Sequence, residues 1–311
     1  MKYRAEIDGL RAVAVIPVIL FHAGFEVFSG GYVGVDVFFV ISGYLITTIL
    51  INEIENQKFS LVGFYERRAR RILPALFFVM LVCIPFAWLW MLPSQLKDFS
   101  QSLIAVSFFG SNIFFWQESG YFAAAAEEKP LLHTWTLAVE EQYYIFFPLF
   151  LFFAWRFGKG RVFWMIVILA ACSLLLSEWG WRNAPTANFY LAPTRAWELF
   201  AGSIAAFIVN KRGIQTSNFL STIGFGAILL SIFLYDQNTP FPSVYALLPV
   251  GGTFLVVMSA GKETIVAKLL SIRILVGVGL ISYSAYLWHQ PLFAFARSEC
   301  LTTHLMVSWL F

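Results

Sequence analysis

The sequence predicts an all-α fold, a polytopic bundle of transmembrane helices with about nine to ten spans and one re-entrant segment. Of the 311 residues, 59% are hydrophobic and 13% are charged, whereas a soluble domain has about a quarter charged residues. Aromatic residues make up 18% of the chain, which is typical of lipid-facing helices with aromatic belts at both interfaces. The net charge of only +3 argues against a nucleic-acid partner and favours membrane lipid.

Ten apolar segments approach the roughly 20 residues that a helix needs to cross about 30 Å of hydrocarbon. No small-residue cleavage pattern follows the first of them, so we expect an uncleaved first span. A further stretch from Leu301 to Phe311 is too short, and the final span is therefore predicted to be incomplete. The ten segments cover approximately residues 10–25, 34–51, 72–92, 102–116, 137–155, 162–178, 189–209, 219–235, 243–260 and 274–295.

Lys and Arg in the short loops indicate which side faces the cytoplasm. If all ten segments crossed the membrane, the last three basic clusters would lie outside. The segment 102–116 is short, carries Ser107, Gly110, Ser111 and Asn112 and leads into a polar loop. We predict that it is re-entrant, which leaves nine spans and a cytoplasmic N-terminus. The basic clusters are Lys2 with Arg4, Arg67–Arg71, Arg156–Arg161, Lys211 with Arg212, and Lys262–Arg273.

This topology divides the ionisable residues between two levels. One group lies at the cytoplasmic face, and the other lies toward the outer half of the membrane. The cytoplasmic group is Asp8, Arg11, Arg68 and Arg71, and the outer group is His22, Asp36, His133, Glu140, Arg195, Glu198 and His289.

His22 is an ionisable residue inside an apolar segment, where such a group costs about 2.5–3.5 kcal/mol on insertion scales and indicates function. It follows Arg11 by eleven residues, which on a helix is about 16 Å and about three turns, so both lie on a similar face. The alternative is a buried histidine that is hydrogen-bonded to a neighbouring helix.

Two adjacent carboxylates, Glu140 and Glu141, follow Trp135 in an apolar segment. Adjacent residues on a helix point about 100° apart, so only one of the two faces a shared cavity. A carboxylate beside His22 orients the imidazole or raises its basicity. The alternative for Glu140 is a structural ion pair with Arg195.

The cluster Arg67–Arg71 precedes the segment 72–92 and serves as a positive-inside anchor. Arg68 and Arg71 also share a helix face, where two guanidinium groups can hold a phosphate by paired hydrogen bonds. Asp36 near a predicted helix start is alternatively a partner of the helix dipole.

Other polar positions are weaker candidates. Ser42 has no G-x-S-x-G context and is interpreted as a helix-packing residue. His289 lies at the outer end of the last segment, where an aromatic belt accounts for Tyr286 and Trp288, so it is interpreted equally as structural or functional. Three widely spaced cysteines indicate neither a disulfide framework nor a metal site.

Six ordered blocks over nearly the whole chain resemble the acyltransferase-3 family of membrane acyltransferases. The blocks are Asp8-Gly9-Leu10-Arg11-Ala12 with His22, Gly34 to Gly43, Phe64-Tyr65 with Arg68, Arg71 and Pro74, Leu132 to Gln142, Pro193-Thr194-Arg195 with Glu198 and Gly202, and Ile281 to His289.

The resemblance implies one membrane acyltransferase domain over residues 1–311. It implies transfer of an acyl group, most often acetyl, from cytoplasmic acyl-coenzyme A to a hydroxyl of lipopolysaccharide O-antigen, exopolysaccharide or peptidoglycan. Acyl-CoA is then a donor substrate, and no permanently bound cofactor is expected. The expected location is the bacterial inner membrane. Relatives often carry a further span and an extracytoplasmic SGNH-type domain, and neither is expected here.

The resemblance also assigns roles to residues. His22 acts as general base or as a transient acyl carrier, with Glu140 or Asp36 orienting it. Arg11, Arg68 and Arg71 bind the phosphates of the donor. The remaining cavity candidates are His133, Trp135, Arg195, Glu198 and His289.

Two other functions fit the same sequence. A transporter or flippase also carries intramembrane charges, but it predicts inverted repeats, and no convincing internal repeat is present. The ending at Phe311 favours the second alternative, an acyltransferase that folds without catalysis.

Overall fold

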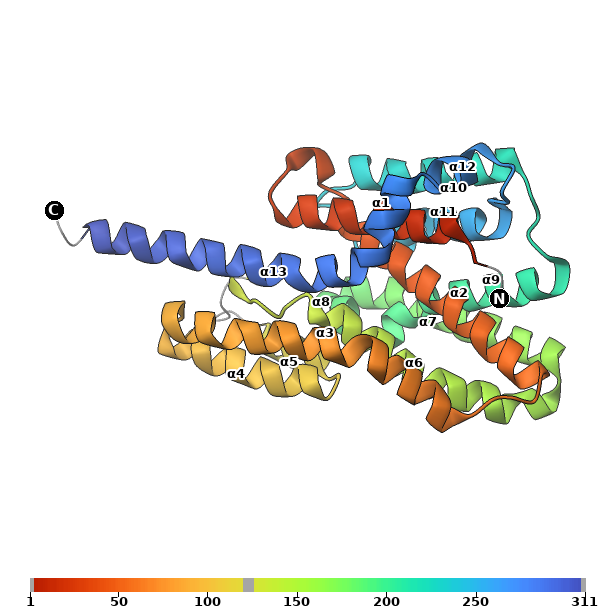
Figure 1. Ribbon diagram of the computed structural model, residues 1–311, viewed down its shortest axis with the longest axis horizontal. Coiled ribbons are helices and arrows are strands. Elements are labelled where there is room, and N and C mark those ends of the chain that lie inside the picture. Colours follow the sequence, from red (N-terminus) through yellow and green to blue (C-terminus); the bar gives the residue numbers. More distant parts are fainter. Residues whose placement is uncertain (1–2, 120–125, 309–311) are drawn as a thin grey trace. The chain divides into compact units, whose positions relative to one another are not determined.

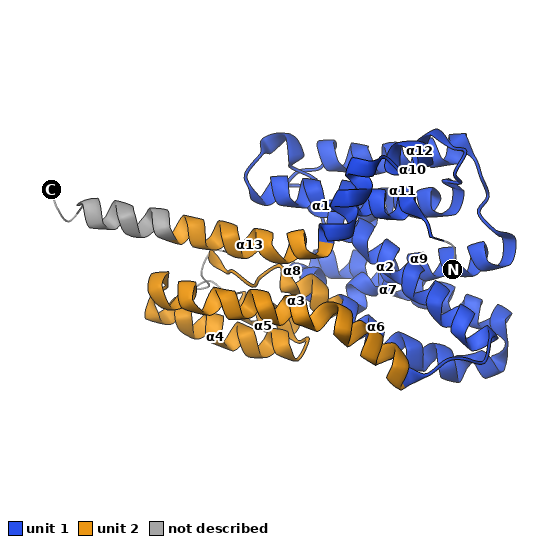
Figure 2. Ribbon diagram, viewed as in Figure 1, with its two compact units in different colours: residues 1–61, 140–282 blue, residues 62–139, 283–311 orange. Residues whose placement is uncertain are grey.

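The computed structural model describes residues 3–119 and 126–308, with side chains described within 3–119 and 127–298. Every regular element in these ranges is a helix (Figure 1). The chain divides into two compact units, unit 1 with residues 1–61 and 140–282 and unit 2 with residues 62–139 and 283–311 (Figure 2).

Unit 1 contains most of the helices. The helix α6 contributes to it from Glu140 onward, and the last helix, α13, contributes as far as Ser282. Short 3-10 turns at Glu26–Phe28, Gly31–Val33, Trp155–Phe157 and Val244–Ala246 join its helices. The helices are α1 (Ala5–His22), α2 (Gly34–Glu55), α6 (Thr134–Ala154), α7 (Lys159–Asn183), α8 (Pro185–Tyr190), α9 (Ala192–Arg212), α10 (Asn218–Leu234), α11 (Leu247–Ser259), α12 (Ile265–Leu270) and α13 (Arg273–Ser308).

Unit 2 is built around the long helix α3 (Leu61–Trp90), which is followed by α4 (Pro93–Ser107) and α5 (Ser111–Glu118). A 3-10 turn at Ala126–Glu128, the start of α6 and the second part of α13 complete it. The helices α3 and α13 run in the same direction, because Tyr283 lies near Ile72 and Phe295 near Phe86. The Tyr283 hydroxyl donates to the Ile72 carbonyl at 3.0 Å, and the rings of Phe86 and Phe295 are 5.9 Å apart.

Among the described residues, four segments are long and apolar enough to cross a membrane, which agrees with a membrane protein. Of the apolar window in the segment Gly31–Glu55, 67% is buried within the protein, against 22% for Lys159–Asn183. The first segment is therefore central to unit 1, and the second presents its apolar side chains to lipid. The other two segments are Leu61–Trp90 and Thr134–Phe157.

Two glycines let α2 and α9 pack closely in unit 1. A Cβ at Gly43 would lie 1.9 Å from the Leu199 carbonyl oxygen, and one at Gly202 would lie 2.0 Å from that of Val40. Small residues at helix crossings are the usual means of close packing in membranes. This crossing fixes the first turns of α2 and α9, which carry buried charges.

All ten predicted apolar segments contain helix, but several have different boundaries. The helix of the segment 72–92 already begins at Leu61, and the segment 189–209 is divided at Leu191 between α8 and α9. The segment 102–116 is not one helix, because α4 ends at Ser107 and α5 begins at Ser111. Phe109, between them, has a φ of 54° in the left-handed region. The last predicted segment, 274–295, is part of one helix that continues to Ser308. The basic loop 262–273 contains the short helix α12, which the pattern of the sequence does not indicate.

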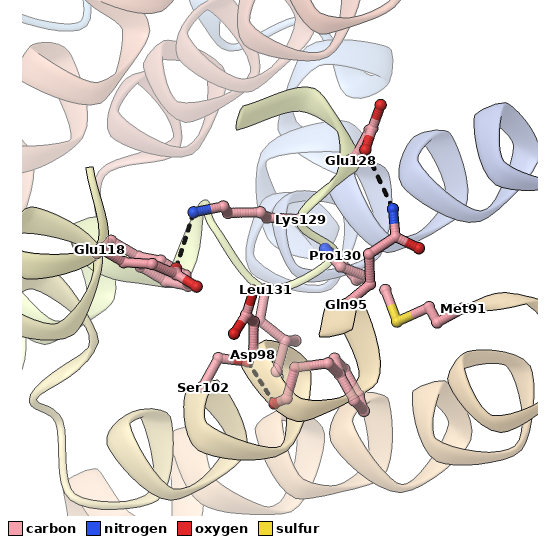
Figure 3. Close-up of a pocket in the computed structure, with 11 residues that line it drawn as sticks. Met91, Gln95, Asp98, Ser102, Glu118, Glu128, Lys129, Pro130 and Leu131 are labelled. Carbon is pink, nitrogen blue, oxygen red and sulfur yellow. Dashed lines mark hydrogen bonds and ion pairs between the residues drawn. The ribbon is translucent and has the colours of Figure 1, made fainter. Parts of the chain in front are cut away.

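The two ends of the α4–α5 segment meet within unit 2. Gln95 in the first turn of α4 donates from Nε2 to Glu128 Oε2, beyond α5, at 3.2 Å. A segment that returns to its starting point begins and ends on the same side of a membrane. The re-entrant segment stays a prediction. A re-entrant segment has its two ends close together, and the hydrogen bond between Gln95 and Glu128 is a contact of this kind (Figure 3).

Cysteine labelling tests the re-entrant segment. We expect single cysteines at Ser94 and Glu127, both exposed, to react with a membrane-impermeant thiol reagent from the same side. A cysteine at Lys58, also exposed, serves as the reference for the opposite, cytoplasmic side. The native cysteines are first replaced by alanine. Labelling of Ser94 and Glu127 from opposite sides would show that the segment crosses the membrane.

Candidate functional site

His22 is the last residue of α1 and is half-buried. Its Nδ1 lies 2.8 Å from the Val18 carbonyl oxygen, four residues earlier in the same helix. A carbonyl oxygen only accepts, so Nδ1 carries the proton. In the neutral ring Nε2 is then the unprotonated, basic nitrogen. A general base needs this tautomer.

Arg195 in the first turn of α9 lies between two carboxyl groups inside unit 1. Its Nη2 is 3.1 Å from Asp36 Oδ1 and 3.3 Å from Glu198 Oε2. The side chains of the three residues are 2%, 0% and 0% exposed for Arg195, Asp36 and Glu198. The rings of Phe39 and Phe241 approach its guanidinium carbon, with centroids 5.5 and 5.6 Å away. Cation–π contacts of this kind are strongest when water is excluded.

The charges in this ion cluster do not cancel if both carboxyls are ionised, because one guanidinium faces Asp36 and Glu198 together. Removing the cation from such a buried group is costly, because an uncompensated buried charge costs several kcal/mol. Arg195 is therefore the residue that holds the two buried carboxyl groups together.

A chain of aromatic contacts connects this ion cluster with His22. Phe241 packs edge-on against Tyr32 at 4.9 Å between ring centroids, and Tyr32 packs against Phe21 at 5.7 Å. Phe21 in turn lies 5.1 Å from the His22 ring. The ion cluster of Arg195, Asp36 and Glu198 is therefore connected to the His22 ring through packed aromatic side chains.

Glu140 and Ser42 are joined by a hydrogen bond within unit 1. The Ser42 hydroxyl donates to Glu140 Oε1 at 2.7 Å and joins α2 to α6. This contact gives Ser42 a polar partner beyond the packing role that the sequence indicated. Glu141, its neighbour, is buried and points to a different side of the helix.

The three candidate donor-binding cations have different surroundings. In unit 1, Arg11 Nη1 lies 3.8 Å from Asp8 Oδ1 near the start of α1. In unit 2, Arg68 is half-buried and packs over the Phe64 ring at 5.8 Å, whereas Arg71 is exposed. The helix α3 already begins at Leu61, so Arg68 and Arg71 lie within it and share a face as predicted.

Two buried histidines lie together in unit 2, and their ring centroids are 5.2 Å apart. His289 Nδ1 lies 2.5 Å from the Tyr286 carbonyl oxygen, so this ring also carries its proton on Nδ1. The Tyr286 hydroxyl donates to the His133 carbonyl at 3.2 Å and lies 2.8 Å from the Thr136 hydroxyl. Trp135, next to Thr136, is also buried.

Comparison with known sequences identifies the chain. The family model described as an acyltransferase domain matches residues 4–301. The chain belongs to the acyltransferase-3 family. No solved structure matches it.

Two relatives of this acyltransferase-3 chain are named for their chemistry. The O-acetyltransferase OatA of Staphylococcus aureus is 33% identical over 313 residues, which cover 96% of this chain and 52% of the relative. The peptidoglycan O-acetyltransferase OatA of Listeria monocytogenes is 34% identical over 309 residues, which cover 94% and 49%. This chain spans about half the length of each relative.

The structure places His289 differently from the sequence-based prediction for this acyltransferase-3 chain. His289 does not lie at the outer end of a helix, because α13 continues to Ser308 and Trp288 packs against Phe78 in the middle of α3. The Tyr286 hydroxyl bonds to the His133 carbonyl just before α6, a contact that an aromatic belt does not require.

Arg4 has a structural role, although its charge near the N-terminus indicates a topology signal in the sequence. Its guanidinium donates to Glu6 at 2.7 Å, to the Tyr44 hydroxyl at 2.8 Å and to the Val257 carbonyl at 3.0 Å. These bonds join α1, α2 and α11 within unit 1. Only its place four residues before Asp8 of a family block set it apart in the sequence.

Proposed function

We propose that this chain transfers an acyl group, most simply acetyl, from acyl-CoA to a hydroxyl of a cell-envelope polysaccharide, with peptidoglycan as the first candidate acceptor. Membership of the acyltransferase-3 family and the names of the two relatives support the reaction class. The observation that carries the proposal is the His22 tautomer, because the Nδ1 bond to Val18 leaves Nε2 as the base.

In the proposed reaction, His22 Nε2 takes the proton of the acceptor hydroxyl as that oxygen attacks the thioester carbonyl. The carbon–sulfur bond then breaks, the ester is released on the sugar, and the proton passes to the thiolate of coenzyme A. In the alternative route Nε2 itself attacks the thioester, and the carbon–sulfur bond breaks to release the thiolate of coenzyme A. The acceptor hydroxyl then takes the acyl group as the bond to Nε2 breaks, and its proton passes to the thiolate. Both routes need an unprotonated Nε2.

We assign positioning roles to Asp36 and Glu140. Asp36 acts through Arg195, whose guanidinium contacts Phe241 at the end of the aromatic chain that reaches His22. Glu140 is fixed by the Ser42 hydroxyl and is the second candidate for orienting the imidazole. The chain would act in the bacterial inner membrane with a cytoplasmic N-terminus, where its basic clusters meet the cytoplasmic donor.

We propose that Arg68 and Arg71 bind the phosphates of the donor. Arg68→Ala or Arg71→Ala is expected to raise the Kd for acetyl-CoA about tenfold, because a charge-assisted pair of hydrogen bonds is lost. Lysine at either position should recover only part of the affinity, since a point charge replaces the planar fork. Calorimetric titration of purified protein measures this change.

Arg70→Ala is the matched control for the donor prediction. Arg70 lies in the same cluster but is exposed and pairs with Glu66 at 2.6 Å. Its removal is expected to leave donor affinity unchanged. Equal weakening by all three alanine variants would mean that the cluster acts only through its total charge.

The acceptor is tested in cells that lack their own envelope O-acetyltransferases. Expression of the chain is expected to add base-labile acetyl esters to peptidoglycan, detected by mass spectrometry of its sugar fragments. Acetyl esters on O-antigen or exopolysaccharide alone would keep the reaction class and replace the acceptor. Movement of an envelope precursor across the membrane with no ester formed would favour a transporter instead.

A further inference from the structure

The residues 262–274 of unit 1, which we call the α12 segment, contain the short helix α12 between α11 and α13 (Figure 1). They link two predicted membrane spans, 243–260 and 274–295, so the segment lies at one surface of the membrane. Three basic side chains against one carboxylate make it positive, which predicts the cytoplasmic surface. The basic residues are Lys262, Lys268 and Arg273, and the acidic residue is Glu263.

The α12 segment has one exposed and one buried side. Exposed residues recur at intervals of three and four, which places them on one face of a helix. The exposed residues are Ile265, Lys268, Leu269 and Ile272, and the buried residues are Val266, Ala267 and Leu270. An exposed face that combines large apolar and basic side chains is typical of a helix that lies in the plane of the membrane interface.

The buried side holds α12 against two neighbouring helices. A Cβ at Gly9 of α1 would lie 1.8 Å from the Leu270 carbonyl oxygen, so the two backbones are in contact. The Ile265 N–H donates to Asn218 Oδ1 at 2.8 Å, which attaches the start of α12 to the start of α10. Because α12 is held on both sides, its apolar outer face stays on the surface of the protein.

Exposed aromatic residues lie on both of these neighbours. Phe219 follows Asn218 in α10 and is 72% exposed. Tyr3 precedes α1 and is 66% exposed, and its hydroxyl donates to Asp8 Oδ2, next to Gly9, at 2.8 Å. Aromatic side chains are enriched where the hydrocarbon of a membrane meets the headgroups. Tyr3 and Phe219 therefore place the α12 segment at the level of the headgroups.

The cations of the α12 segment are accessible to an anionic group. Lys268 Nζ lies 3.8 Å from Glu263 Oε2, and the two side chains are 64% and 88% exposed. An exposed ion pair at this distance is weak, so Lys268 can exchange it for a phosphate. Arg273, at the start of α13, is also exposed, and a guanidinium group forms paired hydrogen bonds with phosphate oxygens. The positive charge favours anionic over zwitterionic headgroups.

We propose that the α12 segment binds anionic phospholipid of the cytoplasmic leaflet. Lys268 and Arg273 hold the headgroup phosphate, and the exposed side chains of Ile265 and Leu269 lie among the upper parts of the acyl chains. Since α12 contacts α1 at Gly9, two residues before Arg11, the same lipids hold the start of α1 at the membrane surface. This binding does not depend on acyl transfer.

The test is fluorescence quenching in lipid nanodiscs that contain the full chain. A bimane fluorophore is attached at Ser271→Cys, an exposed position in the segment, after the native cysteines are replaced by alanine. Brominated phosphatidylcholine or brominated phosphatidylglycerol then quenches the fluorophore where the acyl chains touch it. Phosphatidylglycerol is expected to associate with the segment about fivefold more strongly than phosphatidylcholine, and Lys268→Gln combined with Arg273→Gln should remove this preference.

Lys58→Gln is the matched control, because Lys58 is an exposed cation on the same predicted side but lies outside the segment. It is expected to leave the preference unchanged, and thermal unfolding confirms that each variant is folded. No quenching by either lipid would place the segment in water and overturn the proposal. Equal quenching by both lipids, or a preference that survives in the double variant, would also overturn it. Loss of the preference when acetyl-CoA is added would assign the cations to the donor instead.

Discussion

His22→Gln is expected to lower acetyl transfer about 100-fold or more, because glutamine cannot accept a proton near neutral pH. Glutamine keeps a polar side chain at the end of α1, where the native ring bonds to Val18. Donor affinity and thermal stability should stay near those of the wild type. The rate of labelled acetyl transfer into glycan measures the effect.

His22→Ala supplies the second arm of this test. Imidazole added in solution is expected to restore part of the rate in the alanine variant, which a purely structural histidine would not show. Near-full turnover in the glutamine variant would make His22 structural. The base would then be sought at His133, His289 or Glu140.

Arg195→Met is expected to destabilise the protein by about 3–5 kcal/mol, because Asp36 and Glu198 lose their cation while they remain fully buried. The midpoint of thermal unfolding in detergent should fall by about 10 °C. Fluorescence-detected thermal unfolding of the purified variant measures this shift.

Neutral partners should reverse that loss. Adding Asp36→Asn and Glu198→Gln to the Arg195→Met variant is expected to recover much of the stability, since no buried charge then lacks its partner. Arg70→Met is the control, because its exposed pair with Glu66 contributes at most about 1 kcal/mol. A stable single Arg195→Met variant would contradict the ionic account of the cluster.

The sequence predicted where helices lie better than where they break. Apolar runs of 15 to 22 residues stand out in a chain with 13% charged residues, and each of them lies largely in helix. The break at Phe109 depends on one residue in the left-handed region, and its neighbour Gly110 gave only a weak signal. The continuation of α13 past Phe295 was missed because Arg297 and Glu299 interrupt the apolar pattern.

The sequence predicted which residues belong to the candidate site. It did not predict which of these residues contact one another. Arg195 and Glu198 are one turn apart, so their pairing follows from helix geometry. Asp36 is 159 residues from Arg195, and its contact depends on the α2–α9 crossing at Gly43 and Gly202. The pairing considered for Arg195 was instead with Glu140, whose carboxylate accepts from Ser42.

The small pocket in unit 2 between α4, α5 and residues 128–131 (Figure 3) could not be predicted because its walls come from separate parts of the chain. Gln95 and Glu128 are 33 residues apart and have ordinary loop and helix-start surroundings in the sequence. Their hydrogen bond brings the ends of the α4–α5 segment together, and only folding places Asp98 beside them.

The most direct test of acyl transfer by this chain is reconstitution of the purified protein into liposomes with acetyl-CoA labelled in its acetyl group and a soluble peptidoglycan fragment. The predicted result is one labelled ester on the glycan for each coenzyme A released, with both products lost in His22→Gln. Release of coenzyme A at the same rate in wild type and variant, or no labelled ester from a folded chain that binds acetyl-CoA, would contradict the proposed function.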